Sequence, residues 1–120
     1  MPTEITSAEL SRVRASEARP FSQPEPGLWR RVLAANEKLM LVEHHMNGGW
    51  VGRAHSHPHD QLVYVISGKL QLNAAGQNFE LSAGDSFVVR GGVEHQASAV
   101  EPCHVLDSLH SPARGLLRSF

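Results

Sequence analysis

Short hydrophobic runs separated by turn-forming residues dominate the chain from residue 28 onward. The runs, rich in β-branched and apolar residues, span 29–34, 38–46, 61–66, 69–73, 79–81, 87–89, 96–100 and 103–109. Between them lie glycine-containing turns at 47–49, 67–68, 75–76, 83–85 and 91–92. Short strands at near-regular spacing, joined by such turns, are typical of all-β sandwiches and barrels. The alternate positions expected to form the core are Val63, Val65, Leu70, Leu72, Phe87 and Val89.

The first 27 residues have a different pattern. Thr6-Ser7-Ala8-Glu9 resembles a helix-capping box and predicts a short helix over 8–18, with a thin apolar stripe of Leu10 and Val13. Three prolines and a glycine over 20–27 then predict an extended linker. We therefore interpret residues 1–27 as an N-terminal arm or linker and residues 28–120 as one barrel domain. The arm either packs on the barrel or across a dimer partner, or is a weakly ordered tail.

Composition and charge exclude several classes of partner. The chain has 120 residues, a formal net charge of −1 and a pI of about 6.7, so nothing indicates binding to nucleic acid or to an anionic membrane. No apolar run approaches the ~18 residues that span a bilayer, and the N-terminus lacks the apolar region of a signal peptide. Cys103 is the single cysteine, which excludes an intrachain disulfide. We expect a reducing, cytoplasmic setting.

Four side chains form a candidate metal site. His55 and His57 are two residues apart, so on a strand their side chains point the same way. Gln61 follows four residues after His57, and its amide oxygen can supply a further donor. His95 would join them from a strand distant in sequence. Neutral imidazole is the commonest protein ligand for transition metals, so this set predicts a divalent cation site.

The same residues resemble two motifs of the cupin family. Residues 52–68 resemble the first cupin motif, with His55 and His57 as its histidine pair, Gln61 in the usual glutamate place and Gly68 closing it. Residues 84–95, GDSFVVRGGVEH, resemble the second motif and place His95 in register. The resemblance implies a small jelly-roll β-barrel that binds a metal through His55, His57, Gln61 and His95.

The charge of this ligand set bears on what it binds. Three neutral imidazoles and a neutral amide leave the +2 charge of a cation uncompensated, which favours an anionic ligand such as a small carboxylate or enolate. Imidazole-rich sites accept Zn, Ni, Fe, Mn or Cu, so the identity of the metal stays open. Arg53, two residues before His55, and Arg90, before a glycine turn, are candidate carboxylate-binding residues. The alternative for both is a solvent-facing arginine at a strand end.

A more specific resemblance involves the C-terminal residues. HSHPHDQ over 55–61, GDSFVV over 84–89 and the residues 105–107 and 111–114 resemble the small KdgF-type cupins of pectin and alginate breakdown. Those proteins convert 4,5-unsaturated uronates into linear ketones. The resemblance implies that Asp107 and Arg114 line the site, with Asp107 as general acid or base and Arg114 as a carboxylate clamp. Strand parity agrees, because Asp107 shares a face with Cys103 and Val105.

Several alternatives remain at this stage. An iron-dependent dioxygenase and a non-catalytic module that binds a metal or small molecule both fit three histidines in a cupin barrel. Tyr64 has the wrong parity for a tyrosine-based lyase. The histidines without motif support, which we expect to be ordinary strand or loop residues, are His44, His45, His104 and His110. His59 is expected outside the metal's ligand set. The apolar character of both faces of 62–66 predicts a homodimer.

Overall fold

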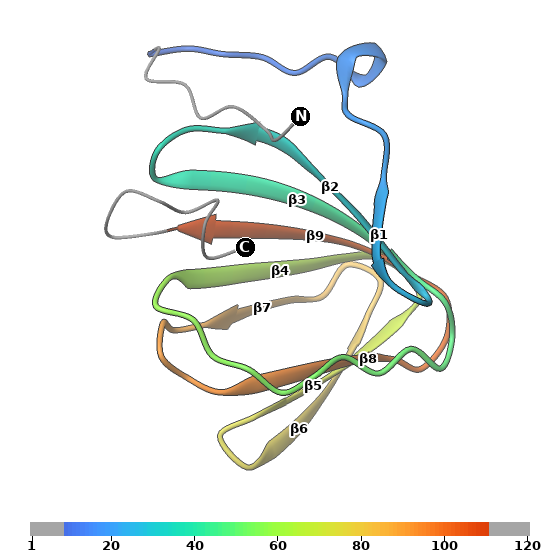
Figure 1. Cartoon of the computed structure of the whole chain (residues 1–120). Helices are drawn as coiled ribbons and strands as arrows, with labels where there is room; N and C mark the ends of the chain where they lie inside the picture. Colours follow the sequence, from blue (N-terminus) through green and yellow to red (C-terminus); the bar gives the residue numbers. More distant parts are fainter. Residues whose placement is uncertain (1–8, 111–120) are drawn as a thin grey trace.

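The fold is an antiparallel β-barrel of the jelly-roll type. The computed structural model describes residues 9–110, whose strands form two sheets that face each other (Figure 1). The larger sheet has the order β1-β2-β3-β9-β4-β7 and the smaller has the order β6-β5-β8. The strands are β1 Ser22–Glu25, β2 Leu28–Ala35, β3 Leu39–Met46, β4 Asp60–Ser67, β5 Lys69–Ala74, β6 Gln77–Ser82, β7 Ser86–Val89, β8 His95–Ala99 and β9 Cys103–His110. The predicted all-β fold is confirmed.

Alternation of side chains along the central strands places the core between the sheets. In β9 every second residue from Cys103 to Leu109 is buried, and β3 shows the same alternation. Of the residues expected in the core, Val63, Val65, Leu70, Leu72 and Val89 are buried, and Phe87 packs against them while partly buried. The inward positions form two separate apolar clusters, a large one and a small one around Met40, Val42 and Leu109.

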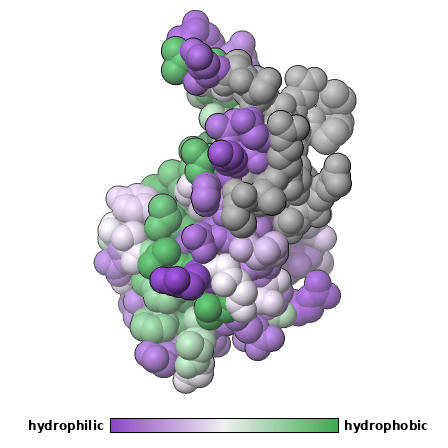
Figure 2. All heavy atoms as spheres, turned by 90° about the vertical axis from the view of Figure 1, so that its left-hand side faces the viewer, coloured by the Kyte–Doolittle hydropathy of each residue, from purple (hydrophilic) through white to green (hydrophobic). Residues whose placement is uncertain are grey.

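The outer face of the sheet around β4 carries exposed hydrophobic side chains. Leu62, Tyr64 and Ile66 alternate with the buried valines of β4, and Val88 of β7 pairs with Leu62 across the two strands. Hydrophobic side chains gather in a band on the face of the molecule shown in Figure 2. Tyr64 faces outward as its parity predicts, away from the barrel interior.

The N-terminal segment differs from the sequence prediction. Within the described residues no α-helix forms over 9–18; a single 3-10 turn, Ala15–Glu17, stands in its place. Leu10 is 91% exposed, so the thin apolar stripe finds no surface to bury against, and an isolated short helix is unstable in water. The extended part of the arm is strand β1, paired with β2 through Ser22 and Arg30. The proposed capping residue Thr6 lies outside the described residues. No described helix is long and apolar enough to cross a membrane.

Candidate metal centre

Three histidines converge at one end of the barrel. His95 begins β8, and His55 forms an isolated antiparallel bridge with it, through backbone N–O distances of 2.9 and 3.0 Å. His57 follows in the loop that leads into β4. One ring nitrogen from each of the three lies within 4.8 Å of the others. Residues from distant parts of the sequence therefore form a cluster able to hold a metal ion.

Backbone hydrogen bonds fix which ring nitrogen faces the cluster. The Nδ1 atoms of His55, His57 and His95 lie 3.0, 2.9 and 2.9 Å from the carbonyl oxygens of Arg53, His59 and Val93, respectively. A carbonyl only accepts, so each Nδ1 carries the proton and each Nε2 presents a lone pair. Metal-binding histidines are held in one tautomer in this way. The Nε2 of His95 is buried and has no hydrogen-bond partner in residues 9–110.

Gln61 adds a fourth donor to the cluster. Its Oε1 lies 3.0 Å from Nε2 of His57. With the proton of that ring on Nδ1, both atoms are acceptors, and either the amide turns its NH₂ group to the ring or a cation lies between them. Two cis ligands at about 2.1 Å from one cation would be separated by about 3 Å, which matches this spacing. The residues present therefore fit a divalent transition metal.

Burial favours the neutral form of two histidines of this region, His95 and His59. Burial lowers the pKa of His95, and its hydrogen bond to Val93 opposes the shift only in part. His59 is 2% exposed and stacks on His57 with ring centroids 4.0 Å apart. Burial, together with the neighbouring His57, lowers the pKa of His59 to about 4. Neutral imidazoles are the form that binds a metal.

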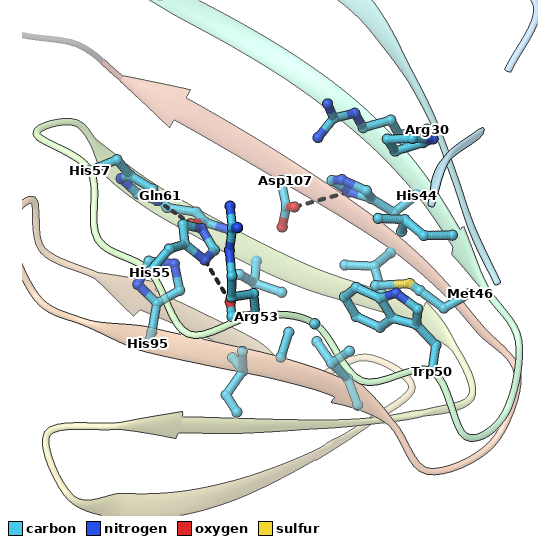
Figure 3. A pocket seen from close by; sticks show the side chains of 18 of the residues that line it. Arg30, His44, Met46, Trp50, Arg53, His55, His57, Gln61, His95 and Asp107 are labelled. Carbon is cyan, nitrogen blue, oxygen red and sulfur yellow. Dashed lines mark hydrogen bonds and ion pairs between the residues drawn. The ribbon is translucent and has the colours of Figure 1, made fainter. Parts of the chain in front are cut away.

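A cavity of about 690 Å³ extends from the histidines into the barrel. Figure 3 shows His55, His57, His95 and Gln61 on one side of it and Arg30, His44 and Trp50 on the other, with Asp107 and Arg53 between them. The volume lies in the range of small-molecule sites. Apolar residues of both sheets complete the wall, including Val63, Leu70, Leu72 and Val105.

Asp107 is a buried acid inside this cavity. It lies on the inward face of β9, as its parity predicts, and is 8% exposed. Its Oδ2 lies 3.0 Å from Nδ1 of His44 on β3, whereas its Oδ1 is buried without a hydrogen-bond partner in the described part of the chain. The expectation that His44 is an ordinary strand residue was therefore wrong. Val42 and Met46, two residues before and after His44, are buried on the same strand. The alternation of side chains along this strand therefore already indicates that His44 points inward.

The candidate arginines have different positions. Arg53 lines the cavity at an exposed position. Arg90 is exposed and is not among the lining residues, which agrees with the alternative of a solvent-facing arginine at a strand end. Val89 at the end of β7 is buried, and successive side chains on a strand point to opposite faces, so Arg90 points outward. Arg114 lies outside the described residues. Arg30 of β2, which the sequence did not single out, lines the cavity instead.

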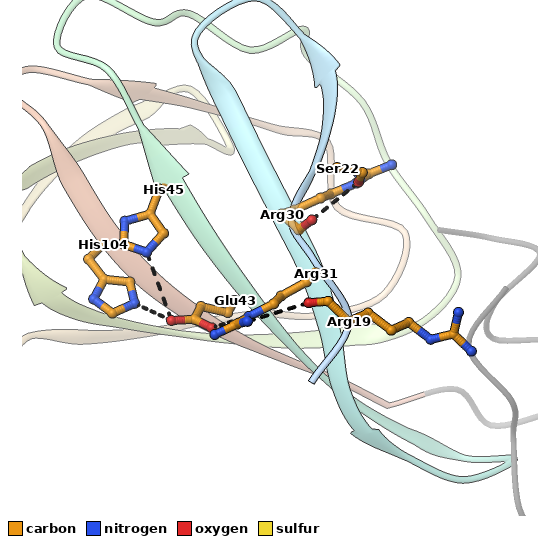
Figure 4. A network of polar contacts seen from close by, with 7 residues as sticks. All are labelled: Arg19, Ser22, Arg30, Arg31, Glu43, His45 and His104. Carbon is orange, nitrogen blue, oxygen red and sulfur yellow. Dashed lines mark hydrogen bonds and ion pairs between the residues drawn. The ribbon is translucent and has the colours of Figure 1, made fainter. Parts of the chain in front are cut away.

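A second group of titratable residues lies on the outer face of the large sheet. Glu43, His45 and His104 place one ligand atom each within 4.8 Å of the others. Glu43 already accepts hydrogen bonds from Arg31 (2.8 Å) and from His104 (2.6 Å), as Figure 4 shows. The rings of His45 and His104 are stacked at 4.1 Å, so one cation cannot lie in the plane of both. Arg31 also covers the ring of Phe21, and the group thus connects the N-terminal segment to the barrel.

Comparison with known proteins agrees with this fold. The family model described as "Cupin domain" (Cupin_2) matches residues 42–109. The chain belongs to this cupin family. It is 27% identical over 106 residues to the pectin degradation protein KdgF of Dickeya dadantii, covering 88% of this chain and 96% of that protein.

Two solved structures share the fold of the whole barrel. The structure of KdgF from a Halomonas species is 34% identical and has a TM-score of 0.77, covering 83% of this chain and 94% of that one. An RmlC-like cupin from Shewanella frigidimarina is 32% identical, with a TM-score of 0.78 and coverage of 92% and 96%. The jelly-roll barrel and the KdgF resemblance inferred from the motifs are confirmed.

Proposed function

We propose that this protein is a metal-dependent enzyme that opens and tautomerises a small unsaturated carboxylate, with a 4,5-unsaturated uronate as the representative substrate. One observation carries the proposal. A buried carboxylate, Asp107, has an unpartnered oxygen in the same cavity as three convergent imidazole nitrogens. The similarity to KdgF, which is named for pectin degradation, supports the uronate class.

The proposed reaction moves a proton and needs no oxidant. Removal of the proton from the anomeric hydroxyl lets the ring C–O bond break, which gives an aldehyde and leaves the electron pair on the ring oxygen as an enolate. Protonation at carbon 4 then yields the ketone. Oδ1 of Asp107 accepts the first proton and returns one to carbon 4. Nδ1 of His44 lies 3.0 Å from the other carboxylate oxygen, close enough to restrict the orientation of the acid.

His55, His57, His95 and Gln61 would hold the divalent cation. When bound, the cation supplies a Lewis acid that stabilises negative charge developing on the substrate oxygens. The ligand set is neutral, so none of the cation's charge is cancelled by the protein. Arg53 at the cavity wall adds a second positive charge for an anionic substrate.

Turnover of a defined substrate tests this proposal. Metal-loaded protein is mixed with 4,5-unsaturated galacturonate, and the ultraviolet absorbance of the substrate double bond and the dissolved oxygen are followed together. We expect the absorbance to fall faster than in substrate alone, without oxygen uptake. Asp107→Asn should slow this loss about 100-fold or more and still retain metal. Oxygen uptake coupled to substrate loss would identify a dioxygenase instead, and binding without any absorbance change would identify a non-catalytic module.

We also propose that the protein forms a homodimer through the outer face of β4. Leu62, Tyr64, Ile66 and Val88 expose 39 to 65% of their surface there, and adjacent exposed apolar residues of this size favour association. Light scattering at micromolar concentration should give the mass of two chains. A Leu62→Lys variant should give the mass of one, and a wild-type monomer would contradict the proposal.

A further inference from the structure

Three polar side chains interrupt the apolar inner face of the large sheet at one level. We call Arg30 of β2, His44 of β3 and Asp107 of β9 the polar stripe. Arg30 pairs directly with His44 across β2 and β3, and Asp107 pairs with Val42 on the other side of β3. All three line the cavity (Figure 3). The residues two positions before and after each are apolar: Leu28 and Val32, Val42 and Met46, Val105 and Leu109.

The polar stripe divides the hydrophobic core. Leu28, Met46 and Val105 belong to the large apolar cluster, whereas Val42 and Leu109 belong to the small one, with Val32 packed against it. Apolar residues at the three positions would join the clusters and bury more apolar surface. Polar groups at such positions carry a desolvation cost. Ionisable residues that are gathered inside a cavity at such a cost are candidates for a binding site.

Arg30 is the cationic member of the stripe. Its position on β2 is half-buried, and burial lowers the pKa of its guanidinium, an effect that the charge of Glu25 opposes. A guanidinium remains charged even so. Glu25 also accepts a hydrogen bond of 2.7 Å from Nε1 of Trp50, so its carboxylate is shared between two partners. Glu25 of strand β1 therefore supplies a counter-charge for Arg30, which also lines the cavity.

We propose that Arg30 binds the carboxylate of the substrate, at the side of the cavity away from the histidine cluster. This assignment rests on the proposed function and makes it more specific: the substrate is a monosaccharide-sized acid whose carboxylate faces Arg30 and whose hydroxyl or ring oxygens face the cation. Asp107, between the two ends, then lies beside the carbons that exchange protons. Arg30 is in this view a specificity-determining residue, because a planar guanidinium pairs with a carboxylate in bidentate fashion.

Paired binding measurements test the assignment without turnover. The metal-loaded full chain is titrated calorimetrically with D-galacturonate and with D-galacturonamide, which has the same shape without the charge. We expect wild type to bind the acid at least about tenfold more tightly, a difference of about 1.4 kcal/mol. Arg30→Met should reduce this preference to less than about twofold, and Arg30→Lys should leave an intermediate preference. Arg31→Met is the matched control, because Arg31 lies next to Arg30 but faces the outer surface and pairs with Glu43.

Each outcome decides for or against the assignment. Equal binding of acid and amide by wild type, or an undiminished preference in Arg30→Met, overturns it. Loss of the preference in Arg53→Met but not in Arg30→Met places the anchor at Arg53 and also overturns it. Metal content and circular dichroism of Arg30→Met and Arg30→Lys show whether each variant is folded. An Arg30-dependent preference without any turnover of unsaturated galacturonate would retain the anchor and reject the proposed reaction.

Discussion

Replacement of Gln61 by glutamate tests the charge of the proposed metal centre. The side chain keeps its length and its donor oxygen, so the 3.0 Å spacing to Nε2 of His57 can persist. One unit of negative charge is added beside the cation. We therefore expect Gln61→Glu to bind a divalent metal more tightly and to bind anions at the metal more weakly.

The magnitude follows from Coulomb's law. Two unit charges about 4 Å apart interact by about 4 kcal/mol at an effective dielectric constant of ~20, and a divalent cation about doubles this attraction before solvent screening and desolvation of the carboxylate are counted. Gln61 is only partly buried, so solvent screening reduces this to about 1–3 kcal/mol. Since about 1.4 kcal/mol corresponds to a factor of ten, metal affinity should rise about 10- to 100-fold. The affinity of an added anion should fall by a similar factor.

Two titrations measure these changes. Chelator competition gives the affinity for Zn²⁺, and azide titration of the Co²⁺-loaded protein, followed in the visible spectrum, gives the affinity for an anion. Gln77→Glu is the matched control, because Gln77 is exposed on β6, is not among the residues that line the cavity, and gains the same charge two strands away from His95. Unchanged metal affinity in Gln61→Glu, or azide binding as tight as in wild type, would refute the view that Gln61 is a ligand of the cation.

The other predictions concern the stability of the barrel. Zn²⁺ at about 1,000 times its dissociation constant should raise the free energy of unfolding of wild type by about 4 kcal/mol. His95→Ala should lose most of this Zn²⁺-dependent stabilisation, measured as the shift of the thermal unfolding midpoint. Burial raises the pKa of Glu43, but hydrogen bonds from Arg31 and His104 outweigh this and hold it below the ordinary 4.5, so its contribution to stability is present above pH 4.5 and is lost as pH falls through the lowered pKa. Glu43→Gln should therefore cost about 1–2 kcal/mol in urea unfolding at pH 7 and progressively less as the pH falls below 4.5. Gly68→Ala should cost about 3 kcal/mol or more, because φ is +90° and a Cβ would collide with the backbone of Pro102 and Cys103. Gly76→Ala, with open space around it, should cost about 1 kcal/mol; equal costs would contradict this steric account.

Strand pattern and turn residues predicted an all-β sandwich or barrel, and the resemblance to the cupin motifs narrowed this fold class to a jelly-roll barrel. The β9 region alternates buried and partly buried residues along its length, and period-two patterns of this kind determine which face of a strand is buried. The same rule placed Asp107 inside and Tyr64 outside. The predicted N-terminal helix was wrong because capping residues indicate where a helix can begin, while its stability depends on an apolar surface to pack against. Leu10 stays 91% exposed within residues 9–110.

The histidine cluster was predictable and the far side of the cavity was not. His55, His57 and His95 stand in motifs whose spacing is informative on its own. Arg30 and His44 stand in no motif, and each looks like an ordinary polar residue within a strand. Their significance depends on β2, β3 and β9 being adjacent, and on the register that pairs Arg30 with His44. Arg90 is the opposite case: it lies in the second motif, but its place in the motif does not determine which way its side chain points.

The arrangement of charge in the cavity limits what it can bind. A cation held by neutral ligands at one end and Arg30 at the other would leave two positive centres, with the carboxylate of Asp107 between them. A neutral sugar would bring no negative charge to either end, and a small monoanion would reach only one. A molecule with a carboxylate at one end and ionisable oxygens at the other would reach both, and its reacting carbons would then lie where the unpartnered Oδ1 of Asp107 can accept and return a proton. We therefore attribute the division of the core by the polar stripe to the proposed binding of such a molecule.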